Sequence, residues 1–131
     1  MTVMTVGKND ILDTYFNGAT FYAGLVSGAT TPTYAASDTL ATHPGWTEDT
    51  ASYSGLNRIT MSWNAAASGS KISNVSSFSI IATATIAGVL VCKSQLKTDT
   101  TGVLYGASSF TLGDRLVQSG DVLNITVTEA A

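Results

Sequence analysis

The longest apolar run in the sequence is Ile86-Ala87-Gly88-Val89-Leu90-Val91-Cys92. This run has the length of a strand, and it falls far short of the roughly 18 to 20 apolar residues that a membrane-spanning helix needs. An unbroken apolar run of this length is typical of a strand that is covered on both faces. The run therefore predicts a buried strand, and we expect no membrane-spanning segment.

Cys92 ends this run and is the single cysteine of the chain. One cysteine forms no intrachain disulfide and no paired-cysteine metal site. No histidine or pair of basic residues lies nearby in the sequence to activate the thiolate. We therefore expect Cys92 to act as a small buried hydrophobic residue.

Further strands are predicted on both sides of the apolar run. The segment 20–27 is rich in β-forming residues, is apolar on both faces and is predicted to be central. The segment 58–63 alternates with a period of two, which predicts a core face and a solvent face. The core face holds Ile59, Met61 and Trp63, and the solvent face holds Arg58, Thr60 and Ser62.

The other predicted strands are 71–81, 103–110, 115–117 and 121–128. Phe78 and Ile80 are predicted to face inward from the first of them. The turn signals Gly113-Asp114 and Gly120-Asp121 bracket the short strand 115–117. The last strand has the clearest period of two, with Leu123, Ile125 and Val127 on its inward face.

The N-terminal part of the chain predicts one helix. Residues 9–18 begin with Asn9 and Asp10 as capping residues, carry apolar side chains at helical spacing and end at Gly18. Residues 1–8 form an N-terminal arm. This arm lacks a basic region followed by an apolar stretch, so we expect no export signal.

These elements predict a mainly β fold, an antiparallel β-sandwich or jelly-roll-like domain of seven or eight strands with one short N-terminal helix. Residues 9–131 form a single domain, because 131 residues leave no room for a second one. A long excursion over residues 28–50 interrupts the pattern, with one possible helical turn at 37–40. Excursions of this length in compact domains are often functional.

Charged residues make up 11% of the chain, against roughly 25% in an average soluble domain. Six Lys and Arg residues against nine Asp and Glu residues leave no basic patch for phosphates, so we expect no nucleic-acid partner. Cores of protein interfaces are depleted of charge. The composition therefore favours permanent assembly with other protein chains.

We expect no enzyme activity, no metal site and no cofactor. His43 is the single histidine and lies in the excursion, where a surface or interface position is expected. Glu48 and Asp49 are neighbours that point in opposite directions on an extended chain. Asp114 and Asp121 lie in turn motifs, where an aspartate commonly accepts main-chain hydrogen bonds.

The aromatic residues of the excursion and its flank, with His43, are the candidate partner-contact residues, namely Tyr34, His43, Trp46 and Tyr53. Exposed aromatic side chains are common anchors of protein interfaces and of sugar sites. Two roles stay open for Trp46, because it could equally fold back to cap an open end of the sandwich.

Four segments carry a resemblance to a known group of proteins. They are Tyr34-Ala35-Ala36-Ser37-Asp38-Thr39-Leu40, His43-Pro44-Gly45-Trp46-Thr47-Glu48, Gly102-Val103-Leu104-Tyr105-Gly106-Ala107 and Ser119-Gly120-Asp121-Val122-Leu123-Asn124-Ile125-Thr126-Val127-Thr128. Together with the opening segment 11–26, they resemble small virion-associated proteins of tailed bacteriophages. None of these motifs is tied to catalytic chemistry.

The resemblance implies a structural protein of the phage head, made in the host cytoplasm. The expected role is that of a capsid cement or decoration protein that bridges major capsid subunits. The expected partners are the major capsid protein and copies of this chain, as a homodimer or homotrimer. The alternative is a tail, neck or fibre module that binds a receptor or a carbohydrate, with Trp46 and Tyr53 stacking on sugar rings.

Overall fold

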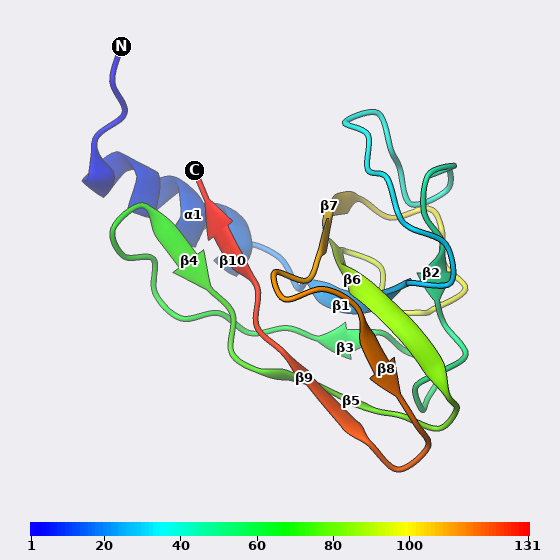
Figure 1. The fold of residues 1–131 in the computed structure, drawn as a ribbon. Helices are drawn as coiled ribbons and strands as arrows, with labels where there is room; N and C mark the ends of the chain where they lie inside the picture. Colours follow the sequence, from blue (N-terminus) through cyan, green and yellow to red (C-terminus); the bar gives the residue numbers. More distant parts are fainter.

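The computed structural model describes residues 1–131 and has a mainly β, sandwich-like architecture with one helix (Figure 1). This architecture confirms the predicted fold class. The helix α1 spans Thr5–Asn17. The strands are β1 (Tyr22–Ser27), β2 (Glu48–Asp49), β3 (Ile59–Thr60), β4 (Ser70–Ile72), β5 (Ser76–Ser79), β6 (Ala84–Cys92), β7 (Leu104–Ser109), β8 (Arg115–Val117), β9 (Val122–Ile125) and β10 (Thr128–Ala130).

The strands form one large sheet and two small ones, and all pairs are antiparallel. The large sheet has the order β2-β1-β6-β7, while β3 also pairs with β1 and β8 also pairs with β6. The longest strand, β6, contains the apolar run and lies between β1 and β7. The two-stranded sheets are β5-β9 and β4-β10.

The core consists of two clusters on opposite faces of the large sheet. Val89 and Val91 belong to the larger cluster, while Leu90 and Cys92 belong to the smaller one, as the period of two along a strand requires. The larger cluster lies between the large sheet and β5-β9, which contributes the buried Phe78. Cys92 is fully buried as predicted, and burial raises the pKa of its thiol.

The helix begins four residues before the predicted start. Met4 provides no side-chain cap, and Asn9 is not a cap residue. The Asn9 side chain instead accepts a hydrogen bond from the Gly69 main-chain N–H at 2.9 Å. The arm predicted over residues 1–8 is therefore extended only over residues 1–4, and it projects away from the body of the protein (Figure 1).

Two predicted strands are each divided into two. The segment 71–81 forms β4 and β5, and the segment 121–128 forms β9 and the start of β10. At the division, Ser73 N–H donates to the Val127 carbonyl and Val127 N–H donates to Ser73 Oγ, both at 2.9 Å. β4 and β10 lie against α1, while β5 and β9 lie under the large sheet (Figure 1).

Arg58 is the clearest error of the strand pattern, because the predicted solvent-facing residue is 2% exposed. Its Nε and Nη2 donate to the two carboxylate oxygens of Glu48 at 2.7 and 2.8 Å. Its Nη1 donates to the Ser94 and Leu96 carbonyls at 2.9 and 2.8 Å. These acceptors offset the desolvation free energy of the buried guanidinium. The period-two pattern missed this burial because it records only whether a side chain is polar.

The predicted faces hold for the rest of the segment 58–63. Met61 is 6% exposed, and Thr60 and Ser62 face solvent. Ile59 and Trp63 are half-buried and pack against the larger cluster. The alternation therefore fails at the one residue that has a charged partner.

Replacement of Arg58 by methionine tests the role of this ion pair. Arg58→Met leaves the buried Glu48 carboxylate without its partner, so we expect the free energy of unfolding to fall by roughly 3–5 kcal/mol. Urea denaturation followed by circular dichroism measures the change. The double variant Arg58→Met/Glu48→Leu removes both charges and is expected to recover much of the loss; equal stability of the two variants would contradict this account.

Candidate functional site

The excursion over residues 28–50 is mostly irregular but well fixed. No helical turn forms at 37–40; a turn at 36–37 takes its place, and Glu48 and Asp49 form β2. One carboxylate oxygen of Asp38 accepts hydrogen bonds from Ala35 N–H at 2.9 Å and from Trp46 Nε1 at 3.0 Å. Because this aspartate serves both donors, it holds the two halves of the loop together.

Three of the four predicted partner-contact residues lie together in this loop. The His43 ring stacks on Trp46 with 3.8 Å between centroids, and Tyr34 lies 6.2 Å from the same indole. Trp46 is 5% exposed and packs in the smaller core cluster with Leu40. Trp46 therefore caps that cluster, while Tyr34 is exposed and His43 is half-buried.

Tyr53 lies apart from this group and is 1% exposed. Its ring packs edge-on against Phe78 with 5.0 Å between centroids, and Lys97 Nζ lies 3.7 Å from the ring centroid. Burial raises the pKa of its hydroxyl, which has no hydrogen-bond partner. Tyr53, a predicted contact residue, is therefore buried rather than exposed, and neither Trp46 nor Tyr53 has a ring face free to stack on a sugar.

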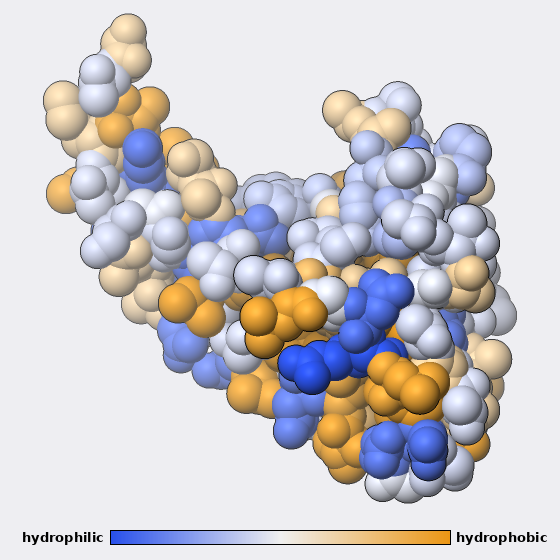
Figure 2. Space-filling model, in the orientation of Figure 1, coloured by the Kyte–Doolittle hydropathy of each residue, from blue (hydrophilic) through white to orange (hydrophobic).

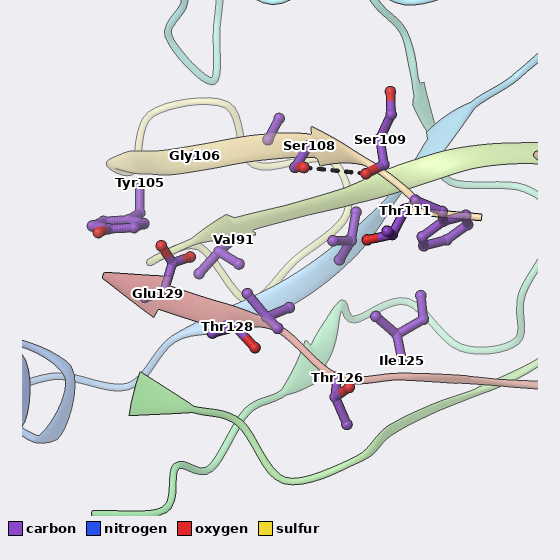
Figure 3. Close-up of a pocket in the computed structure, with 14 residues that line it drawn as sticks. Val91, Tyr105, Gly106, Ser108, Ser109, Thr111, Ile125, Thr126, Thr128 and Glu129 are labelled. Carbon is purple, nitrogen blue, oxygen red and sulfur yellow. Dashed lines mark hydrogen bonds between the residues drawn. The ribbon is translucent and has the colours of Figure 1, made fainter. Parts of the chain in front are cut away.

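The structure adds a feature that the sequence did not indicate, an open groove of about 780 Å³ between β7 and the segment β9-β10 (Figure 3). Val89 and Val91 line it from β6, and Ile125 and Val127 line it from the opposite side. The remaining lining residues are Tyr105, Gly106, Ala107, Ser108, Ser109, Phe110, Thr111, Thr126, Thr128 and Glu129. The outline of the molecule is hollowed between the end that holds α1 and the end that holds the excursion (Figure 2).

The β7 strand that borders the groove is the edge strand of the large sheet. Phe110 N–H donates to the Ala87 carbonyl of β6 at 2.9 Å, on the same register as the pair Gly88 and Ser109. Along an antiparallel strand, residues alternate between those whose main-chain groups bond to the neighbouring strand and those whose main-chain groups point away from it. Since Phe110 bonds to β6, the N–H groups of Ala107 and Ser109 point away from β6. These groups have no main-chain partner.

The groove continues into the excursion. Tyr105, Gly106 and Ala107 also line a hollow of about 320 Å³ together with Tyr34 and Trp46. The Tyr34 hydroxyl and Ser109 Oγ form a hydrogen bond at 3.0 Å, which fixes the exposed aromatic ring beside the strand edge. We call this continuous surface the β7 face: the groove, the open edge of β7 and the hollow at Tyr34.

The β7 face is nearly free of charge, since Glu129 is the one charged residue that lines the groove. Burial raises the pKa of the Glu129 carboxyl, and a hydrogen bond with the Tyr105 hydroxyl partly offsets this effect. Side chains of exposed leucine and valine extend the apolar surface around β8 and β9 (Figure 2), namely Leu112, Leu116 and Val122. Such a surface suits an extended, uncharged chain segment better than a charged small molecule.

A strand edge leaves little trace in a sequence, because unpaired main-chain groups depend on which strands become neighbours. The one available signal was composition: Leu104-Tyr105-Gly106-Ala107-Ser108-Ser109 contains no charged residue and no proline. Edge strands of monomeric proteins usually carry charged residues or proline, which prevent pairing with other chains. Their lack marks β7 as a strand whose edge is not protected.

No three of the His, Cys, Asp and Glu side chains form a group that could hold a metal ion. The structure has no helix with the length and apolar character needed to cross a membrane. No protein-family model matches the chain, and no curated protein matches its sequence.

The Asp38 contacts predict the behaviour of the loop. Asp38→Ala leaves the buried Trp46 Nε1 without an acceptor, so we expect a loss of about 1–3 kcal/mol in unfolding free energy. Tryptophan fluorescence should shift to the red as Trp46 becomes hydrated. Asp38→Asn keeps an acceptor oxygen and should leave the emission close to that of the parent; a red shift of the same size in both variants would contradict the assignment.

The raised pKa of Glu129 predicts a stability difference that depends on pH. The folded chain binds this proton more tightly than the unfolded chain, so the ionised carboxyl destabilises the fold above the ordinary pKa of 4.5. Glu129→Gln should therefore melt at a higher temperature than the parent at pH 7. The difference should disappear below pH 4.5, where both states of the parent are protonated; a pH-independent difference in scanning calorimetry would refute this.

Proposed function

We propose that this chain is a non-enzymatic structural protein of a tailed-phage virion, a capsid cement protein that binds major capsid subunits and copies of itself. The observation that carries the proposal is the β7 face. It combines an unpaired strand edge, a groove lined by apolar and mostly uncharged polar residues, and an exposed tyrosine on one continuous surface. An unprotected edge of this kind offers main-chain hydrogen bonds to a second chain.

The rigidity of the body also supports a cement role. The Arg58–Glu48 pair and the Lys71–Asp13 pair are each anchored by a fully buried cationic side chain. Lys71 joins segments that are distant in sequence through Asp13, and Arg58 does so through the Ser94 and Leu96 carbonyls. A protein that bridges subunits must resist deformation when the shell is under load. Repeated weak contacts on a symmetric shell then add through avidity, so each interface can be modest in area.

The low charge and the resemblance of the four quoted segments to virion-associated proteins point the same way. A surface with few charges has little electrostatic protection against lasting contact. The alternative of a sugar-binding fibre module has lost its expected stacking residues, because Trp46 and Tyr53 are both buried. No specific observation therefore favours the alternative.

Quantitative mass spectrometry of purified phage particles tests the proposal. We expect this chain in a fixed, high ratio to the major capsid protein, because a cement protein occupies sites that recur over the whole shell. Absence of the chain from the particles would overturn the virion role. A few copies per particle would overturn the cement role and favour a neck, tail or fibre component.

A further inference from the structure

We propose that residues 1–4 of one copy bind as an added strand beside β7 of a second copy, in the groove between β7 and β9-β10. This inference rests on the proposed association of the chain with copies of itself and names the contact. It assigns the open groove to a partner of defined chemistry, an extended N-terminal arm without charged side chains.

The arm has the conformation and exposure that a donated strand requires. Residues 1–4 are not helical, and Met4 has extended dihedrals, φ −73° and ψ 156°. The side chains of Met1, Val3 and Met4 are exposed, and Val3 lies beside Gly7 in the first turn of α1. Three exposed apolar side chains in a row of four residues gain by burial, at about 25 cal/mol per Å² of apolar surface.

The groove provides main-chain hydrogen-bond donors and an apolar lining for the arm. The outward N–H groups of Ala107 and Ser109 are unpaired, and main-chain pairing with an extended segment satisfies them. Val89, Val91 and Ile125 supply an apolar lining for the side chains of Met1 and Val3, which share one face of an extended segment. Four residues in strand conformation span about 13 Å, which fits within the six residues of β7.

The charges of the arm and of the groove are compatible. The arm and the first three residues of α1, residues 1–7, contain no charged side chain. Glu129 in the groove is already partly desolvated, and a second unpaired charge there would be costly. The side chains of the arm therefore add no such charge, and the α-ammonium group of Met1 is opposite in sign to an ionised Glu129 carboxylate.

The arm points away from the groove of its own chain (Figure 1). Phe16 near the end of the helix contacts Tyr105 at the start of β7, with 4.9 Å between centroids. Thr5 lies eleven residues earlier along the helix, about 16 Å away from this contact. Residues 1–4 continue outward from that end (Figure 1), so the occupant of the groove belongs to another copy.

Proline substitutions on both sides of the contact test the exchange by sedimentation equilibrium of the full-length chain. Val3→Pro and Ala107→Pro each remove one N–H from the proposed pairing, but neither N–H is used within the monomer. We expect each to weaken association roughly tenfold, the equivalent of one lost hydrogen bond. The matched controls Val3→Thr and Ala107→Val keep the N–H and should associate like the parent.

A monomeric parent at the highest soluble concentration would overturn the proposal, and so would an oligomer that both proline variants leave intact. Circular dichroism distinguishes lost association from lost folding. Val3→Pro lies outside the helix and sheets, so its result stands even if Ala107→Pro fails to fold.

Disulfide trapping identifies the contact directly. Val3→Cys protein mixed with Ser108→Cys protein should form a mixed dimer on mild oxidation, because Ser108 lines the groove. Leu56→Cys is the control, since Leu56 is 81% exposed and lies outside the groove lining. The native Cys92 is fully buried and should not interfere. Equal trapping by the Ser108→Cys and Leu56→Cys proteins would overturn the proposal.

These experiments use the isolated protein, whereas the copy-number measurement uses the particle. A chain that exchanges arms but is absent from virions would refute the virion role alone. A chain that is abundant in virions but does not exchange arms would refute only the inference drawn here.

Discussion

The buried guanidinium of Arg58 ties together the parts of the fold that have no regular pairing of their own. It binds Glu48 at the end of the excursion and the carbonyls of Ser94 and Leu96 in the loop that precedes β7. A Cβ on Gly24 would lie 2.7 Å from the Glu48 carboxylate, so the glycine leaves room for this pair over β1. The excursion and the β7 edge are therefore both placed by one charged side chain.

The same constraint explains why the β7 face is well defined. β7 follows a loop whose carbonyls are held by Arg58, and the Asp38 contacts hold the excursion beside it. At Gly88, a Cβ would lie only 2.0 Å from the Ser108 carbonyl oxygen, so β6 and β7 approach closely. A strand that is fixed on one edge and open on the other is suited to bind a second chain.

Assembly through such an edge needs little charge and no large flat interface. The main chain supplies the hydrogen bonds, and the apolar side chains supply the burial, which agrees with a chain that is 11% charged. Reciprocal exchange of arms between two copies closes a dimer, whereas exchange in one direction closes a ring such as a trimer. Both outcomes agree with the proposed association of this chain as a homodimer or homotrimer.

The sequence by itself determined the strand content, the burial of Cys92 and the inward faces of Phe78 and Ile125, because side-chain polarity with a period of two is a local property. It also placed Tyr34, His43 and Trp46 in one loop. Only the tertiary structure decided the burial of Arg58, the cap role of Trp46 and the division of the last strand. These depend on partners distant in sequence, as does the open edge of β7, which exists because no other strand of the chain lies beside it.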